Sequence, residues 1–225
     1  MSMNRSLIKW AALAVLVLVG CSKAQPAAAP APQPTYRTRA DSSAIARAKA
    51  DSARHPYTEA DVRFMSAMIG HHSQALVMAG WAPTHGASPP VERLAERIIN
   101  GQQDEILTMQ NWLRDRQQPV PEPRAAGMQM GTGHGHGGHD MLMPGMLTEA
   151  QMRQLEGSKG REFDRQFLTF MIQHHEGAVT MVKELLGTRG AAQDEMTFKL
   201  ATDVNVDQTT EIARMKQMLE ALPPQ

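Results

Sequence analysis

The sequence predicts an all-α protein whose main domain is a four-helix bundle built from two duplicated helical hairpins. The first observation is an internal repeat, because residues 61–78 align with residues 164–181 and share the pattern Phe-x-x-x-Met-Ile-x-His-His. The second is that a further repeated segment follows each copy, at residues 102–113 and 208–219. The third is that no stretch alternates polar and apolar residues as a strand does. Two helix pairs with apolar stripes bury these stripes most simply against each other.

The first 20 residues are expected to be a lipoprotein signal peptide. Arg5 and Lys9 flank the start of an apolar run that is too short to span a bilayer. The following Leu-Val-Gly-Cys, residues 18–21, matches the lipobox of bacterial lipoproteins, which implies cleavage before Cys21 and acyl chains that anchor it to a membrane. An ordinary secretory signal with a chance cysteine is the alternative. We therefore expect a cell-envelope location, on the periplasmic side or the cell surface.

The mature chain is expected to begin with a tether and a short helix. Residues 21–40 are rich in Ala and Pro and cannot bury a core, so they form an extended tether. Residues 41–56 suit a short polar helix. About 170 residues remain, which is enough for one domain. This bundle domain covers residues 57–222. It consists of repeat one (57–118), the crossover (119–147) and repeat two (148–222).

Capping residues, prolines and glycines set the expected helix ends. Thr58 with Asp61, and Thr148 with Gln151, are hydroxyl and polar pairs three residues apart, typical of helix starts. Prolines favour the first turn of a helix or follow its end. The expected helices cover roughly residues 58–80, 89–117, 161–186 and 191–222, with a short helix after Thr148.

Charge and composition exclude one class of partner and favour another. The chain has 23 basic and 23 acidic residues, and loss of Arg5 and Lys9 with the signal peptide leaves a net charge of −2. No basic patch indicates nucleic-acid binding. Aromatic residues make up 4% of the chain while there are 17 methionines, a balance that favours soft-metal chemistry.

The repeated histidine pairs are the strongest candidate metal ligands. In each repeat, a methionine lies three residues before the first histidine and another seven residues after it. The candidate ligands are Met68, His71, His72, Met78, Met171, His174, His175 and Met181. Thioether sulfur selects Cu(I) or Ag(I), and imidazole accepts Cu(I), Cu(II) or Zn. Because neutral imidazole is the ligand form, affinity is expected to fall as pH drops towards the histidine pKa.

A purely structural interpretation stays open for the same residues. The apolar side chains around each pair also form a helical core stripe, and adjacent histidines point about 100° apart, so at most one of them faces straight into the core. Asp61 and Asp164 lie ten residues before the first histidines and are expected to stabilise helix N-termini instead. Glu105 and Glu211 are either partners of imidazole N–H groups or solvated surface residues.

The crossover contains a second candidate metal-binding segment. Residues 128–146 hold five Met and three His spaced by glycine: Met128, Met130, His134, His136, His139, Met141, Met143 and Met146. Such a flexible tract is not expected to pack in a core, so burial does not explain its methionines. A short His-rich tract is typical of metal binding, and a neutral linker is the alternative.

These motifs resemble the domain of unknown function 305 family of bacterial proteins. The resemblance rests on the His-His pattern and the Gln-x-x-Glu-Ile-x-x-Met pattern, each present twice, and it covers roughly residues 57–222. It implies a ferritin-like four-helix bundle exported to the periplasm or cell surface. Some members of this family are periplasmic copper-binding proteins, and the resemblance assigns the ligand role to the Met and His residues of both repeats.

The expected function is copper binding in the envelope, by capture, buffering or transfer of Cu(I) or Cu(II). Its partners are the ion, a membrane through the anchor on Cys21, and a protein that exchanges copper. We do not expect an enzyme. A ferritin-like metal-dependent oxidase is an alternative, but it needs Glu-x-x-His motifs, and Ile69 and Ile172 occupy the Glu positions. A structural or sensory lipoprotein that is indifferent to metal is the other alternative.

Overall fold

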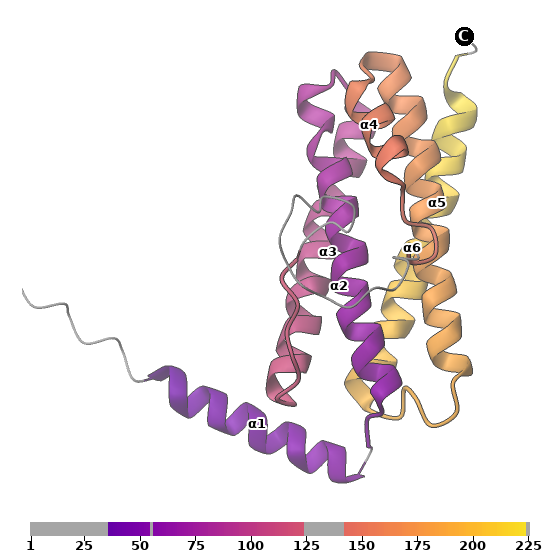
Figure 1. Cartoon of the computed structure of the whole chain (residues 1–225). Coiled ribbons are helices and arrows are strands. Elements are labelled where there is room, and N and C mark those ends of the chain that lie inside the picture. The colour runs from indigo at the N-terminus through magenta and orange to yellow at the C-terminus, as the bar shows by residue number, and fades with distance from the viewer. Residues whose placement is uncertain (1–35, 55, 124–141, 224–225) are drawn as a thin grey trace, which may run out of the picture. The chain divides into compact units, whose positions relative to one another are not determined.

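The computed structural model describes residues 36–54, 56–123 and 142–223, and every regular element in these ranges is helical, as predicted (Figure 1). The elements are α1 (Tyr36–Arg54), α2 (Glu59–Gly80), the short 3-10 helix η1 (Ala82–Thr84), α3 (Pro89–Asp115), α4 (Glu149–Gly157), α5 (Gly160–Gly187) and α6 (Glu195–Ala221). None of these helices is long and apolar enough to cross a membrane. Cys21 and its lipobox lie outside the described residues.

Helices α2 and α5 form the central pair of the bundle. Helix α3 packs along α2, and α6 packs along α5, so each repeat is a helical hairpin and α2 and α5 join the two hairpins (Figure 1). Asp61 at the start of α2 accepts a hydrogen bond from the backbone N of Ala192, beyond the end of α5, at 2.7 Å. Helices α2 and α5 are therefore antiparallel. This crossing places the middle of each helix, where the histidine pairs lie, against the middle of the other.

The two repeated aspartates fasten one repeat to the other. Asp61 completes the capping box of α2, because it accepts a bond from Thr58 N at 2.6 Å while the Thr58 hydroxyl accepts from Asp61 N. Its second oxygen holds Ala192. Asp164 accepts a bond at 3.0 Å from the backbone N of Ser88, the residue that precedes α3. The predicted helix-terminus role is confirmed for Asp61, and both buried carboxylates also hold a loop of the opposite repeat.

Two helix starts differ from the sequence predictions. Helix α1 begins at Tyr36, so residues 36–40 are helical instead of belonging to the tether, because Pro34 is the last proline before them. Helix α6 begins at Glu195 instead of near residue 191. Ala192 has a φ of 54°, which a right-handed helix does not allow, and Asp194 caps the helix by accepting a bond from Thr197 N at 3.0 Å.

The apolar core consists of two clusters, one on each side of the histidine pairs. The first core cluster joins the N-terminal half of α2 to the C-terminal half of α5, and the second joins the opposite halves. Methionines from both repeats meet in each cluster. The first contains Met65, Met68, Met109 and Met181, and the second contains Met78, Met171 and Met215.

The last residues of the crossover, 142–147, dock onto the central helix pair. The Gln74 amide donates to the backbone O of Leu147 at 3.0 Å and accepts from its N at 2.7 Å. Met146 and Leu147 are buried. The expectation that the Met/His-rich tract does not pack in a core is therefore wrong for its C-terminal end, because polar side chains of α2 and α5 satisfy its backbone groups.

Gly101, in the middle of α3, offers a simple test of the fold. A Cβ atom built at this exposed position meets no atom within 4 Å. We expect Gly101→Ala to raise the free energy of unfolding by about 0.5–1 kcal/mol, because glycine is a poor helix former. Urea denaturation followed by circular dichroism measures this change. An unchanged or lower stability would contradict the open position of Gly101.

Candidate metal centre

The four histidines of the two pairs meet at the centre of the bundle. All four side chains are fully buried. The rings of His71 and His174, the first histidine of each pair, lie with their centroids 3.9 Å apart and their planes inclined by 39°. From the sequence, at most one histidine of each pair is expected to face straight into the core. The second histidine of each pair, His72 or His175, is nevertheless buried because α3 covers His72 and α6 covers His175.

Hydrogen bonds to carbonyl groups fix the tautomers of the inner histidines. The Nε2 of His71 lies 3.0 Å from the backbone O of Pro144, and the Nε2 of His174 lies 3.0 Å from the backbone O of His71. A carbonyl oxygen accepts but does not donate, so each Nε2 carries the proton. The Nδ1 of each neutral ring therefore carries a free lone pair.

The outer histidines each contact a glutamate of the neighbouring helix. The Nε2 of His72 donates to Glu105 of α3 at 2.7 Å, and the Nε2 of His175 donates to Glu211 of α6 at 2.7 Å. The two glutamates are partly buried, with 15% of each side chain exposed. Of the two roles left open by the sequence, the structure places both glutamates as partners of imidazole N–H groups.

The other ring nitrogen, Nδ1, has no hydrogen-bond partner in any of the four histidines. A buried polar atom without a partner is rare and calls for an explanation. His85, a buried histidine outside the two pairs, shows the contrast. Its Nδ1 contacts the Thr84 hydroxyl at 2.9 Å and its Nε2 contacts the backbone O of Glu156 at 2.8 Å, so both of its nitrogens are satisfied.

Burial keeps the inner histidines neutral. Loss of hydration, together with the neighbouring His72 and His175, lowers the pKa of His71 to about 3, against the raising effect of the Pro144 carbonyl. Burial also holds the pKa of His174 well below its ordinary value, with further lowering by the surrounding histidines. Both rings are therefore in the neutral form that binds metals throughout the physiological range.

The predicted methionine ligands lie in the core on both sides of the histidines. Met68 and Met181 belong to the first core cluster, and Met78 and Met171 to the second. Each pair combines one thioether from each repeat. The four methionines are buried, so they form the core stripe that the structural interpretation expected, and their metal-ligand role stays a prediction.

The crossover ligands divide into two groups. Met143 is partly buried against the first core cluster, and Met146 is buried, so both have a packing role. The other six lie outside the described residues: Met128, Met130, His134, His136, His139 and Met141. Within the described ranges, no group of three or more His, Cys, Asp or Glu side chains is placed to hold a metal ion.

Sequence reasoning missed the glutamines around the site. Gln74 and Gln173 hold the 142–147 segment, and Gln102 and Gln208 are buried with amide oxygens that lack a partner. A signal for the last two was present, because Gln102 and Gln208 occupy matching positions in the two repeats. No comparable signal marks Gln74, whose counterpart in repeat two is Gly177.

The fold and the site define a duplicated four-helix bundle with a buried histidine pair at the centre of each repeat. The model of the DUF305 family, described as a domain of unknown function, matches residues 61–219. The chain belongs to the DUF305 family.

Solved structures agree with this assignment. A DUF305 fragment from Deinococcus radiodurans is 30% identical with a TM-score of 0.60, over 74% of this chain and 99% of that one. A candidate secreted DUF305 protein from Streptomyces coelicolor is 28% identical with a TM-score of 0.59, over 72% of this chain and 92% of that one. CopM in its Cu(II)-bound form is 31% identical with a TM-score of 0.54, over 71% of this chain and 95% of that one. CopM is also known in Cu(I)-bound and Ag-bound forms.

One curated protein matches a short part of the chain. The uncharacterized protein L153 of Acanthamoeba polyphaga mimivirus is 38% identical over 56 residues, which are 25% of this chain. The match spans 37% of the length of that protein, so it adds nothing on activity.

Proposed function

We propose that this protein binds copper in the cell envelope, with Cu(I) as the favoured ion. The observation that carries the proposal is the set of four buried imidazoles, each with its Nε2–H held by an oxygen acceptor and its Nδ1 without a partner. Histidines that bind metals usually donate their other N–H to a carboxylate or a backbone carbonyl, which fixes the ring and raises the basicity of the ligand nitrogen. The similarity to CopM, solved with Cu(I), Cu(II) and Ag, supports the choice of ion.

The donor types match this choice. Thioether sulfur and neutral imidazole bind Cu(I) well, and the methionine pairs Met68 with Met181 and Met78 with Met171 lie on either side of His71 and His174. The described residues contain no preformed group of three or more His, Cys, Asp or Glu ligands. The proposed ligand set therefore combines imidazole with thioether donors.

The role in the cell belongs to the same proposal. Capture, buffering or transfer of copper needs ligands and an exchange partner, and no catalytic group. Ag(I) and Zn are alternative ions. The lipid on Cys21 holds the bundle at a membrane on the periplasmic side or the cell surface.

A Cu(I) titration against a competing chelator tests the proposal. We expect the chain from residue 22 onward to compete successfully for Cu(I). Exchanging His71 and His174 for Gln is expected to weaken binding. The double variant Glu105→Gln/Glu211→Gln is expected to weaken it by about 10- to 100-fold, because loss of a carboxylate partner has this effect on metal-ligating histidine.

Two further variants locate the ion and control for folding. Met→Leu at the four bundle positions 68, 78, 171 and 181 keeps the core volume and removes the sulfur. Serine at the six candidate ligands of residues 128–141 removes the crossover ligands and leaves the docked residues 142–147 intact. Circular dichroism shows whether each variant is folded. A parent protein that takes no Cu(I) from the chelator, like every variant, would contradict the proposal and leave a metal-indifferent lipoprotein as the better account.

A further inference from the structure

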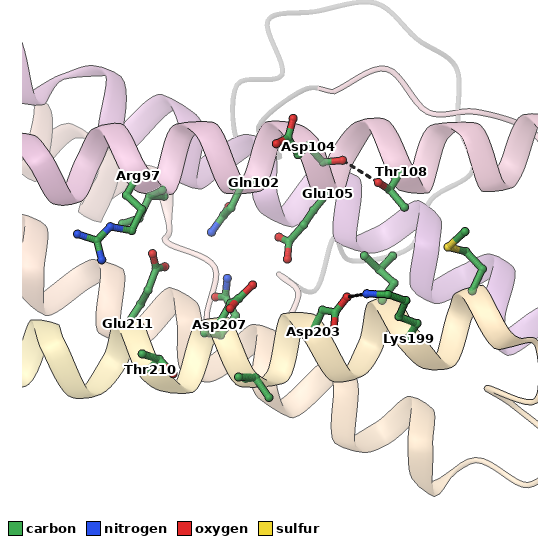
Figure 2. Close-up of a pocket in the computed structure, with 16 residues that line it drawn as sticks. Arg97, Gln102, Asp104, Glu105, Thr108, Lys199, Asp203, Asp207, Thr210 and Glu211 are labelled. Atoms are coloured by element: carbon green, nitrogen blue, oxygen red, sulfur yellow. Dashed lines mark hydrogen bonds and ion pairs between the residues drawn. The ribbon is translucent and has the colours of Figure 1, made fainter.

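A groove of about 800 Å³ runs between α3 and α6 (Figure 2), and its lining includes Glu105 and Glu211, the glutamates that contact His72 and His175. It exists because α3 packs on α2 and α6 packs on α5, while α3 and α6 have little direct contact with each other. Five acidic residues and two basic residues line it: Asp104, Glu105, Asp203, Asp207, Glu211, Arg97 and Lys199. Because the acidic residues outnumber the basic ones, the groove carries an excess of negative charge. Lys199 forms an ion pair with Asp203.

Asp207 lies close enough to Glu105 and Glu211 to be influenced by their charges. Figure 2 shows Glu105 reaching from α3 towards α6, and Asp207 and Glu211 on the facing side of α6. Partial burial raises the pKa of Asp207, and the charges of Glu105 and Glu211 raise it further. A carboxylate whose pKa is raised by neighbouring negative charges is stabilised in its charged form by a cation placed beside it.

A second observation points to a ligand in the groove. Gln102 and Gln208 line it, each is 2% exposed, and the Oε1 of each, together with the Nε2 of Gln102, has no hydrogen-bond partner. Amide carbonyl oxygens, carboxylates and water are the ligands of hydrated divalent cations. The unsatisfied oxygens and the acidic side chains therefore favour the same kind of ligand.

The groove also leads to the candidate metal centre. His72 and His175 are fully buried, and the carboxylates that they contact, Glu105 and Glu211, line the groove and are partly exposed. A cation bound by these two glutamates would share their carboxylates with the imidazoles of His72 and His175.

We propose that the α3–α6 groove is the capture site for a hydrated divalent cation, Cu(II) under the proposed function, and that Glu105 and Glu211 pass the ion to the buried histidines. The inference rests on the proposed copper binding. The oxygen donors of the groove suit the divalent ion with part of its water shell, while the thioethers of the core suit Cu(I). Capture involves no change of oxidation state.

The repeat supplies a matched pair of variants for a test. Gln102 aligns with Gln208 and Glu105 with Glu211, so Gly101 of α3 is the counterpart of Asp207 of α6. A Cβ atom built at Gly101 meets no atom within 4 Å and Gly101 lines the groove, so Gly101→Asp adds a second carboxylate there. Asp207→Asn removes the existing one. Gly101→Asn and Glu184→Gln, an exposed position of α5 that does not line the groove, are the controls.

Stopped-flow mixing with Cu(II), followed by quenching of tryptophan fluorescence, measures the association rate. At low ionic strength we expect Asp207→Asn to slow association about threefold and Gly101→Asp to accelerate it by a similar factor, because a nearby charge changes the local concentration of the cation. Both differences are expected to shrink at high salt. The controls are expected to match the parent.

The outcomes separate the two proposals. If the parent binds Cu(II) and Asp207→Asn associates as fast as Glu184→Gln at low salt, the capture role of the groove is overturned and copper binding stands. If the parent gives no saturable quenching and takes no Cu(I) from the chelator, copper binding and the capture site fail together.

Discussion

Replacing Gly177 by alanine is expected to lower the free energy of unfolding by about 3 kcal/mol. Gly177 lies in α5 where the 142–147 segment docks, and a Cβ atom there falls 1.9 Å from the backbone O of Pro144 and 2.6 Å from the Cα of Gly145. These are backbone atoms, so no side-chain rotation relieves the overlap. The segment must leave α5 or the helix must shift.

The same substitution is expected to disturb the candidate metal centre. Pro144, whose carbonyl overlaps with the new methyl group, is the acceptor for the Nε2–H of His71. Displacing it leaves a buried imidazole donor without a partner, which adds to the cost. Urea denaturation gives the stability, and the chelator competition described above gives the copper affinity of the variant.

Gly101→Ala is the matched control, because it is the same exchange in the middle of another bundle helix. It is expected to stabilise the protein while Gly177→Ala destabilises it, so the two variants differ in sign. A Gly177→Ala protein as stable as the parent would show that the 142–147 segment is not packed on α5 as described.

The repeat explains why most of the fold is predictable from the sequence. The two copies of Phe-x-x-x-Met-Ile-x-His-His show which positions of α2 and α5 are equivalent. The capping residues Thr58 and Thr148 mark helix starts that the structure confirms. The alignment also puts Glu105 and Glu211 at matching positions, and the structure then shows that both contact the histidines. Local patterns and symmetry therefore carry this part of the information.

Features that break the symmetry were not predictable in this way. Gln74 and Gly177 occupy matching positions and hold the same 142–147 segment in different ways, one through its amide and the other through the absence of a side chain. The segment itself has no helical or strand period, so its docking depends on tertiary contacts that the sequence does not display. The α3–α6 groove likewise depends on how two hairpins are placed and not on any local pattern.

The stability of the protein is expected to fall as the pH drops from 7 to 5. Burial lowers the pKa of His71 from 6.5 to about 3, and it lowers the pKa of His174 in the same direction. Below pH 6.5 the unfolded chain takes up protons at these histidines and the folded chain does not, so acid favours unfolding. The stabilising contribution is complete above pH 6.5 and is lost as the pH falls towards the folded pKa.

The expected size is about 1.4 kcal/mol per pH unit for each of the two histidines below pH 6.5. Urea midpoints between pH 7 and pH 5 measure this slope, in a range where most carboxylates stay ionised. The double variant His71→Gln/His174→Gln is expected to show a much flatter profile. Asp207, whose pKa is raised, contributes with the opposite sign, and Asp207→Asn controls for it. Equal slopes in the parent and the double histidine variant would contradict the burial of neutral rings.

Copper affinity is expected to respond to pH in a different way from stability. The sequence alone predicts that affinity falls as the pH approaches the histidine pKa, which for an ordinary imidazole means below about 6.5. Because the folded protein keeps His71 neutral down to about pH 3, no proton competes with the metal at that ring between pH 7 and pH 5. With His71 and His174 as the ligands, the Cu(I) affinity of the folded protein stays nearly constant over this range while its stability declines. A tenfold loss of affinity per pH unit below pH 6.5 would place the copper on histidines other than His71 and His174, with the tract of residues 134–139 as the first candidate.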